Sequence, residues 1–394
     1  MRRPSLLVVV QRYGDVSGGA EAHARELVRR LAPHLDITVA TTTAADYWTW
    51  ANVFQAGETR VDGVRVLRFP VVRRRARDFR RYERAAFATV HALDDERAFI
   101  EAQGPVAPDL LDYVFRHGRE YDHALFFTYI YYPTVFGLPL VPECAVLVPT
   151  AHDEPALRLS TYRALFHAPR AIAFNTVEER ELVHTTFHNE RISNEIVGVG
   201  INVPDDASTD RFRERFGIAG PYVLYVGRIV QSKGCDELFD AWARWKAARP
   251  EVRATLVLAG SAEMAIPARE DVKHVGFLDE RDKFDAYAGC AAFVMPSRLE
   301  SLSLVTLEAW AMGRPVVCSA FSPVVASMAK RAGAGLPYDS HETFGESIEM
   351  LIEDPKLACA LGEAGRDFVR STYTWPRVVE TYLDLFAEVR ARNG

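Results

Sequence analysis

Short apolar runs rich in Val, Leu, Ile and Phe recur along this 394-residue chain, and stretches of helical length separate them. This alternation is typical of parallel sheets whose strands are joined by crossover helices. The runs are apolar on both faces, as strands buried between two layers of helices are. The expected strands are 6–10, 36–41, 64–69, 123–128, 145–150, 171–176 and 194–200 in the first half, and 222–227, 254–260, 272–277, 291–297 and 315–320 in the second.

Two such series predict an α/β protein with two Rossmann-like domains, because single cores usually stop growing near about 250 to 300 residues. Residues 201–220 are polar and contain prolines and glycines, which predicts a linker with one short helix. We therefore expect domains at 1–200 and 221–375, and a final helix at 376–394 that crosses back to the first domain. The site is expected in a cleft at the carboxyl ends of the strands.

Composition and charge argue against several classes of protein. A net charge of -6 argues against a general nucleic-acid binder. Five scattered cysteines without C-x-x-C spacing suggest neither a disulfide framework nor a zinc site, and they favour the reducing cytoplasm. The apolar run at 6–10 is too short for the core of a secretory signal. The uncharged stretch 124–142 contains three prolines, so we expect a strand and an aromatic loop there and no membrane span.

Residues 298–315, RLESLSLVTLEAWAMGRP, place Glu300 and Glu308 on either side of an uncharged segment. The segment from Ser303 has the apolar spacing of a helix, and Gly313 is placed to end it. Glu300 then lies in the loop after an expected strand and Glu308 lies inside the helix, so both can face one site. The amides at the start of this helix form a site suited to a phosphate. They belong to Ser301, Leu302, Ser303, Leu304 and Val305.

Two further segments place glycines between a strand and a helix. The segment 225–234, YVGRIVQSKG, brings Gly227, Arg228 and Lys233 together, and these two cations could neutralise a diphosphate. It is not a P-loop, because G-x-x-x-x-G-K-[ST] is absent. After the first expected strand, Gly18 and Gly19 would let the backbone approach a ligand closely, although G-x-G-x-x-G is absent too.

Five motifs together resemble the retaining glycosyltransferases of family 4, which have the two-domain GT-B fold. They are SGGAE (17–21), HDE (152–154), VGVGIN (197–202), VGR with KG (226–234) and E-x7-E (300–308). The resemblance covers essentially the whole chain and is most specific in the second half. It implies the transfer of a sugar, with retention of anomeric configuration, from a nucleotide-diphosphate sugar to a hydroxyl of a glycan, a lipid-linked saccharide or a small molecule. It implies no cofactor and no metal, and no metal-ligand motif appears in the sequence.

The resemblance also implies roles for residues in the second half. Glu308 would bind the ribose hydroxyls of the donor, and Glu300 would hold the transferred sugar. Arg228 and Lys233 would bind the diphosphate near Gly227. The nucleobase would rest against the segment 274–277, which includes Gly276 and Phe277. Ser301 and Ser303 replace the glycines of the family's frequent E-G-F-G, which leaves the identity of the donor sugar open.

In the first half, the resemblance implies that His152 contacts the sugar from the opposite domain and that Gly18 and Gly19 lie against the donor or the acceptor. Each of these residues also has a structural interpretation. His152 could be a structural histidine, and Asp153 could cap a helix that enters at Pro155. Gly18 and Gly19 could simply form a tight turn.

Several charged and aromatic segments also have two interpretations. The two glutamates could form surface salt bridges with Arg298 or Arg314. The stretch 73–87 carries seven arginines and could contact an anionic membrane or a phosphorylated acceptor, or be a solvated helix with internal ion pairs. Tyrosines at 129, 131 and 132 could stack on an acceptor or pack in the core.

Two further classes of function share the expected architecture. One is a non-hydrolysing nucleotide-sugar epimerase, an isomerase that needs no acceptor. The second is a catalytically silent protein that only binds a nucleotide sugar. The presence of both glutamates and both cations favours the transferase. We expect a cytoplasmic location, with peripheral contact at the inner face of the membrane through 73–87.

Overall fold

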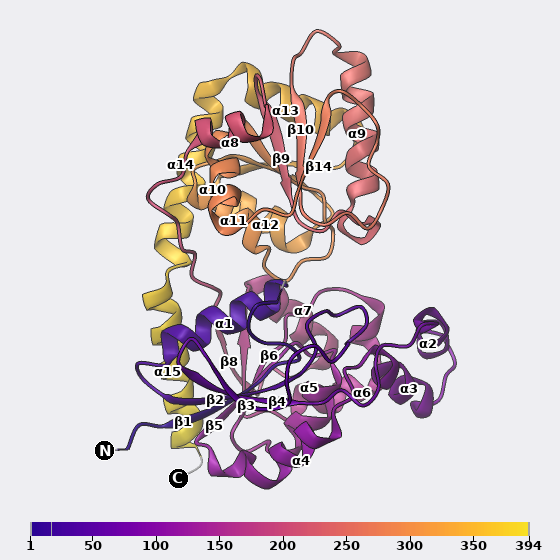
Figure 1. Ribbon diagram of the computed structural model, residues 1–394, viewed down its shortest axis with the longest axis vertical. Coiled ribbons are helices and arrows are strands. Elements are labelled where there is room, and N and C mark those ends of the chain that lie inside the picture. The colour runs from indigo at the N-terminus through magenta and orange to yellow at the C-terminus, as the bar shows by residue number, and fades with distance from the viewer. Residues whose placement is uncertain (1, 17, 393–394) are drawn as a thin grey trace. The chain divides into compact units, whose positions relative to one another are not determined.

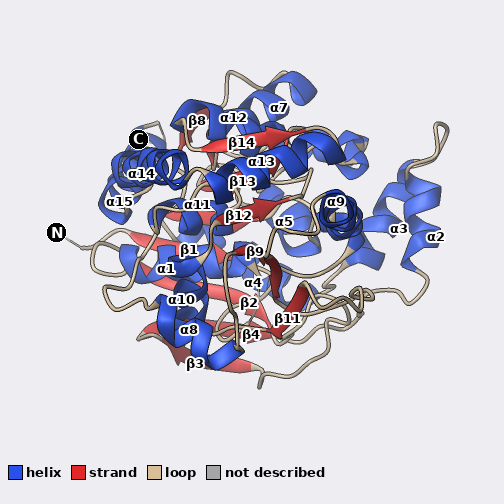
Figure 2. Cartoon of the chain, turned by 90° about the horizontal axis from the view of Figure 1, so that it is seen from above, coloured by secondary structure: helices blue, strands red, loops and turns tan. Residues whose placement is uncertain are grey.

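The computed structural model describes residues 2–16 and 18–392 (Figure 1). The chain divides into two compact units. Unit 1 comprises Met1–Val199 with Trp375–Gly394, and unit 2 comprises Gly200–Thr374. Each unit contains one sheet that is wholly or mainly parallel, covered by helices (Figure 2). The expected α/β class with two Rossmann-like parts is therefore confirmed.

The sheet of unit 1 has the strand order β3-β4-β2-β1-β5-β6-β7-β8. Neighbouring strands are parallel except for β3 and β4, which form an antiparallel hairpin at the edge. The strands are β1 (Ser5–Val9), β2 (Asp36–Thr42), β3 (Gly57–Val61), β4 (Val64–Phe69), β5 (His123–Phe127), β6 (Ala145–Val148), β7 (Ala171–Phe174) and β8 (Ser193–Ile196).

The longer helices of unit 1 include the last helix of the chain. They are α1 (Gly19–Leu31), α2 (Phe79–Ala86), α3 (Leu93–Gln103), α4 (Pro108–His117), α5 (Tyr132–Gly137), α6 (Ser160–His167), α7 (Val177–Phe187) and α15 (Trp375–Ala391). Helix α15 packs against α1, β7 and β8, so the end of the chain belongs to unit 1. Its predicted range, 376–394, began one residue late, and residues 393 and 394 lie outside the described part of the chain.

The sheet of unit 2 is entirely parallel, in the order β11-β10-β9-β12-β13-β14. Its strands are β9 (Tyr222–Val226), β10 (Thr255–Ala259), β11 (Val272–Gly276), β12 (Ala292–Met295), β13 (Val316–Ser319) and β14 (Gly335–Tyr338). Its helices are α8 (Thr209–Phe216), the 3-10 turn η4 (Gln231–Lys233), α9 (Cys235–Ala248), α10 (Glu280–Gly289), α11 (Leu304–Ala311), α12 (Pro323–Ala332), α13 (His341–Glu353) and α14 (Pro355–Thr372).

Every strand expected from the sequence forms, but the sequence did not predict β3 or β14. Strand β3 is mostly exposed and polar, so it lacks the apolar run that marks a buried strand. The adjacent residues Asp62 and Gly63 both have positive φ, which suits a tight hairpin turn to β4. Strand β14 lies at the other sheet's edge and contains Pro337, which is tolerated only at such a position.

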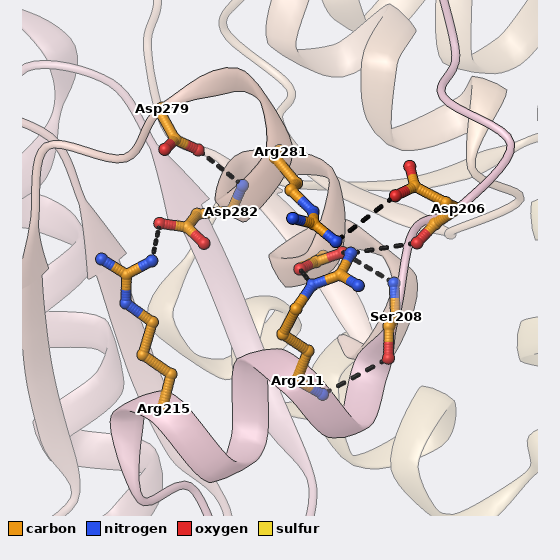
Figure 3. Close-up of polar contacts among 8 residues, drawn as sticks. Asp206, Ser208, Arg211, Arg215, Asp279, Arg281 and Asp282 are labelled. Atoms are coloured by element: carbon orange, nitrogen blue, oxygen red, sulfur yellow. Dashed lines mark hydrogen bonds and ion pairs between the residues drawn. The ribbon is translucent and has the colours of Figure 1, made fainter.

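Helix α8, which lies in the expected linker, is tied firmly to α10 (Figure 3). The carboxylate of Asp285, which is fully buried, accepts hydrogen bonds from the Ser208 amide at 2.6 Å and from the Arg211 guanidinium. Arg215 forms an ion pair with Asp282 on the same face of α10. The linker's helix is therefore an integral part of unit 2.

The loops after β9 and β10 approach each other more closely than side chains would allow. Gly260 has φ +139°, and a Cβ atom there would lie 1.9 Å from the carbonyl oxygen of Gly227. The amide of Gly227 donates to the Ala259 carbonyl at 2.9 Å. Glycine at 260 is thus required for the two loops to leave the sheet side by side.

We expect Gly260→Ala to destabilise the protein by at least about 3 kcal/mol, because the new Cβ would overlap backbone that cannot move without breaking the strand ends. Gly333→Ala is the matched control. Gly333 also has positive φ, but a Cβ there meets nothing within 4 Å, so about 1 kcal/mol of backbone strain is expected. Urea denaturation of both variants measures the difference, and equal losses would contradict the steric argument.

Candidate active site

The sheet of unit 2 reverses its strand order between β9 and β12. From β9 the chain adds β10 and β11 on one side, and it then returns to add β12, β13 and β14 on the other. In open α/β sheets, ligands bind outside the carboxyl ends of the strands at such a reversal. Lys233 and Glu300 follow β9 and β12, the two strands at this point.

The structure brings Lys233 and Glu300 into direct contact. The Nζ atom of Lys233 lies 2.6 Å from Oε1 of Glu300, and the Glu300 side chain is only 11% exposed. Gly234 makes this approach possible, because it has φ +72° and a Cβ there would lie 2.7 Å from the carbonyl oxygen of Pro296, just after β12. A larger residue would push Lys233 away from the end of β12.

Glu308 lies in α11 and is held by two residues of α10. Its Oε1 accepts from Lys283 Nζ at 2.8 Å, and its Oε2 accepts from the Tyr287 hydroxyl at 3.0 Å. Burial raises the pKa of Glu308 above its ordinary value, and the Lys283 ammonium opposes that rise. Burial lowers the pKa of Lys283, but Glu308 and Glu280 outweigh burial, so its pKa is raised. Burial and the neighbouring Glu308 also raise the pKa of Tyr287.

Arg298 and Arg314, the two arginines nearest the glutamates in sequence, bind elsewhere in the structure. Arg298 pairs with Glu237, at 2.9 Å. The Nη1 atom of Arg314 lies 3.5 Å from the carbonyl oxygen of Cys290. The two glutamates have partners from η4 and α10, which sequence proximity could not identify.

Helix α11 begins with Ser303 at its N-cap in the left-handed region, with φ +67°. The Ser303 hydroxyl contacts the Thr306 hydroxyl at 2.8 Å, and its carbonyl accepts from the Thr306 and Leu307 amides. Leu302 is buried, whereas Ser301, Leu304 and Val305 are partly exposed. The amides that precede Thr306 at the start of α11 have no carbonyl partner within that helix, so this end can accept an anion.

The remaining predicted residues of unit 2 lie after β9 and β11. The Arg228 guanidinium is 3.8 Å from Glu263, and the Arg228 carbonyl accepts from the Tyr225 hydroxyl at 2.7 Å. At the end of β11, the Gly276 carbonyl accepts from the Gly260 amide at 2.8 Å. The next residue, Phe277, is 75% exposed. A flat apolar ring at a strand end is suited to stacking on a nucleobase.

In unit 1, Gly18 and Gly19 follow β1, where that sheet also reverses its strand order. Gly18 has φ +149°, and a Cβ there would lie 2.1 Å from Oε2 of Glu21. Glu21 and Arg12 form a buried ion pair at 2.6 Å. Gly18 therefore leaves room for this pair, which supports a structural role at that position. Residue 17 of the SGGAE motif lies outside the described residues.

His152 lies in the loop after β6, beside Glu154. Its Nδ1 is 3.3 Å from Oε1 of Glu154, which also accepts from the Tyr129 hydroxyl at 2.7 Å. Asp153 pairs with Arg158 at 2.6 Å, while Glu154 occupies the N-cap position of the 3-10 turn Pro155–Arg158. The structural interpretation, in which Asp153 could cap this turn, does not hold, because the N-cap residue is Glu154.

The tyrosines after β5 mainly pack against other rings. Tyr129 is 1% exposed and contacts the ring of Tyr162 edge-on at 4.8 Å. Tyr131 lies edge-on to Trp50 at 5.3 Å, and Tyr132 lies against Phe136 at 4.8 Å. Packing within unit 1 accounts for the placement of these rings.

Glu179, which the sequence did not single out, fixes the backbone next to His152. Its Oε1 accepts from the Ala151 amide at 2.6 Å, and its Oε2 accepts from the Asn175 amide at 2.6 Å. It therefore joins the loops after β6 and β7. The side chain is buried, and this burial, outweighing the hydrogen bonds from Asn175 and Ala151, raises the pKa of Glu179 to about 8.

This raised pKa predicts how stability depends on pH. Between about pH 4.5 and pH 8 the unfolded chain has released the Glu179 proton and the folded chain retains it, so the free energy of unfolding falls as pH rises. We expect a contribution of up to about 1.4 kcal/mol per pH unit. Denaturant titrations across this range should show that Glu179→Gln removes the fall, whereas Glu181→Gln, an exposed control on the same helix, keeps it. Parallel profiles for wild type and Glu179→Gln would contradict the prediction.

The described residues, 2–16 and 18–392, contain neither a metal-ligand cluster nor a membrane-spanning helix. These residues contain no group of three or more His, Cys, Asp and Glu side chains arranged to hold a metal ion. None of their helices has the length and apolarity needed to cross a bilayer.

Comparison with solved structures identifies the fold. Sucrose-phosphate synthase from Thermosynechococcus elongatus superposes with a TM-score of 0.71 at 17% identity, covering 99% of this chain and 100% of that one. The Anabaena protein HepE in complex with UDP-glucose superposes with a TM-score of 0.70 at 15% identity, covering 98% and 99%. This chain has the GT-B fold. The expected fold class is thereby confirmed.

Sequence comparison agrees with this fold. Residues 220–354 match the family model described as "Glycosyl transferases group 1". A GDP-mannose-dependent monoacylated alpha-(1-6)-phosphatidylinositol monomannoside mannosyltransferase of Corynebacterium glutamicum is 29% identical over 184 residues, 44% of this chain and 48% of that protein. A D-inositol 3-phosphate glycosyltransferase of Jonesia denitrificans is 26% identical over 269 residues, 62% and 63% of the two chains. The matches thus span about half to two thirds of these relatives.

Proposed function

We propose that this protein is a glycosyltransferase that moves a sugar from a nucleotide-diphosphate sugar to a hydroxyl group of an acceptor. The observation that carries the proposal is the contact between Lys233 and Glu300 where the strand order of unit 2 reverses, with Glu308 on the helix that follows. These residues lie inside the segment that matches the glycosyltransferase model.

In this proposal, unit 2 binds the donor. Glu308 accepts hydrogen bonds from the ribose hydroxyls, and the nucleobase rests beside Gly276 and Phe277. Lys233 and Arg228 neutralise the diphosphate beside Gly227. The amides of the segment 301–305 add hydrogen-bond donors at the positive end of α11.

In this proposal, Lys233 and Glu300 are paired in the free protein and separate when the donor binds. A bound diphosphate, with its greater negative charge, attracts the Lys233 ammonium. Glu300 is then available to accept hydrogen bonds from hydroxyls of the transferred sugar. Breaking a pair that is partly buried costs energy, so the diphosphate and the sugar hydroxyls must together replace it.

We further propose transfer with retention of configuration, as in family 4. The acceptor hydroxyl attacks the sugar carbon on the face from which the diphosphate leaves, and a leaving-group phosphate oxygen takes the acceptor proton. The carbon–oxygen bond to the phosphate breaks as the bond to the acceptor forms. Positioning and stabilisation of the developing charge on the leaving group supply the catalysis.

Unit 1 supplies the acceptor side in this proposal, with His152 at the sugar and Gly18 and Gly19 near the ligands. The named relatives act on an inositol phosphate and on a phosphatidylinositol monomannoside, which supports a saccharide, a small polyol phosphate or a lipid-linked saccharide as the acceptor. Their names and the UDP-glucose complex support either GDP-mannose or UDP-glucose as the donor.

Product analysis distinguishes this function from an epimerase and from a silent binder. Incubation with UDP-glucose or GDP-mannose and a set of inositol and saccharide acceptors should release nucleoside diphosphate only when an acceptor is present, and NMR should show a retained anomeric configuration. Conversion of the nucleotide sugar without an acceptor would indicate an epimerase. Binding without turnover would indicate a silent binder.

The two glutamates should separate binding from turnover. We expect Glu308→Ala to weaken nucleoside diphosphate binding at least about tenfold, since ribose hydrogen bonds to a charged group are each worth about 1.5 kcal/mol or more. Glu300→Ala should not weaken that affinity, since Lys233 then has no carboxylate to leave, and should lower kcat at least about a hundredfold. Calorimetry and steady-state kinetics measure both, with the exposed Glu346→Ala as a control. Unchanged affinity in Glu308→Ala would refute its assignment.

The arginine-rich stretch 73–87 supports a proposal of peripheral contact with an anionic membrane. Helix α2 turns Phe79 toward Phe99 in the core of unit 1, at 5.5 Å between ring centres, and leaves Arg80, Arg81 and Arg84 exposed. Arg73 pairs with Glu101 at 2.7 Å. A helix with its arginines on one side is suited to contact anionic lipid head groups. In this proposal, the protein is cytoplasmic and contacts the inner face of the membrane.

Exposed arginines near an anionic surface contribute about 1 kcal/mol each. We therefore expect the triple change R80E, R81E and R84E to reduce binding to vesicles containing about 30% phosphatidylglycerol by at least about tenfold in a sedimentation assay. The exposed arginines at 60, 116 and 119, changed to glutamate together, serve as the control. Equal losses in both variants, or no binding by the wild type, would refute a specific surface.

A further inference from the structure

Helix α10 contributes two side chains to Glu308, although neither belongs to the motifs that led to the site. Lys283 and Tyr287 are one helical turn apart and therefore project from the same face of α10. Lys283 and Glu308 are each only 14% exposed, so their ion pair is largely removed from water. Removing these two charges from water is costly, and their mutual attraction offsets that cost.

Each oxygen of the Glu308 carboxylate has one of the two contacts. Lys283 donates to Oε1 and Tyr287 donates to Oε2. A carboxylate oxygen has two acceptor positions, so each oxygen keeps one for a further donor. The vicinal hydroxyls of a ribose offer two such donors at neighbouring positions.

The other face of α10 is anchored, which gives this arrangement a rigid support. Asp282 binds Arg215 of α8 (Figure 3). Asp285 binds Arg211 of the same helix. Asp279 caps the helix by accepting from the Asp282 amide at 2.9 Å. Helix α10 is thus fixed between α8 and the site, and it holds Lys283 and Tyr287 at a defined distance from Glu308.

We propose that Lys283 and Tyr287 are positioning residues that fix the Glu308 carboxylate for bidentate recognition of the ribose 2′- and 3′-hydroxyls of the donor nucleotide. This inference rests on the proposed function. Lys283 and Tyr287 contact Glu308 and act through it. Two fixed donors prevent rotation of the carboxylate. Ribose binding therefore loses less conformational entropy of the Glu308 side chain.

The ionisation of Glu308 supports the same arrangement. Burial raises the pKa of Glu308, and the opposing influence is the positive charge of Lys283, while Glu280 adds a further negative charge nearby. Without Lys283, burial and Glu280 would favour the neutral acid. A neutral acid has one hydroxyl donor in place of a full set of acceptors, so it would pair poorly with two ribose hydroxyls.

A purely structural role makes a different prediction. If the ion pair only stabilised unit 2, its removal would lower stability and weaken every ligand in the site to the same degree. If it positions Glu308, its removal should weaken ligands with both hydroxyls more than ligands that lack one. The ratio of the two affinities therefore separates the roles.

The test measures the Kd of UDP, GDP and ADP and of their 2′-deoxy forms for the whole chain by calorimetry at about pH 7.5. Wild type should prefer the ribose form of the nucleotide it binds by at least about tenfold, or about 1.4 kcal/mol. In Lys283→Met the preference should fall below about threefold, and deoxy affinity should fall less than ribose affinity. Tyr287→Phe should show a smaller reduction, and Lys283→Arg should restore part of the preference. Lys356→Met, an exposed lysine of α14, is the matched control.

The outcomes distinguish this inference from the proposed function. Equal weakening of ribose and deoxy forms in Lys283→Met would overturn the positioning role and leave the proposed function intact. A wild type that binds a nucleotide without preferring ribose would overturn the assignment of Glu308. A wild type that binds none of the three diphosphates would overturn the proposed function together with this inference. Deoxy affinity also reports whether Lys283→Met is folded, since an unfolded variant would lose it.

Discussion

The candidate site depends on one constraint, the reversal of strand order between β9 and β12. Because these strands are parallel neighbours, the loops that follow them leave the same edge of the sheet in opposite directions. Lys233 and Glu300 come from these two loops, 67 positions apart in the chain. Gly234 lets the first loop lie directly on the carbonyl of Pro296, so the contact follows from backbone packing as well as from charge.

Buried carboxylates in this protein are paired in distinct ways, and the difference indicates distinct roles. Glu21 has an arginine partner and Glu308 has a lysine partner, and each cation offsets part of the desolvation of its carboxylate. Glu179 accepts hydrogen bonds from two backbone amides, and burial raises its pKa to about 8. The first arrangement suits ligand recognition or loop support, and the second suits a structural bridge between two loops.

Unit 2 shows how the surroundings of a site can matter as much as the residues that would touch a ligand. Arg211 and Arg215 of α8 hold one face of α10, and Lys283 on the opposite part of that helix holds Glu308. A segment that resembles a linker by its prolines and glycines thereby supports the part of the candidate site around Glu308. Desolvated ion pairs of this kind are sensitive to geometry, because each charge depends on its partner to offset the loss of water.

The sequence by itself determined the alternation of strands and helices, the two sheets and the position of Glu300 and Glu308 around a helix start, since these depend on local apolar patterns and turn residues. It missed the edge strands β3 and β14, whose residues lack a buried pattern. Only the tertiary structure decided the partners of each charge. Lys283 with Glu308, and Glu179 with the Ala151 amide, join segments 25 and 28 positions apart. Such pairings follow from strand order and helix packing, which a one-dimensional pattern of polar and apolar residues does not encode.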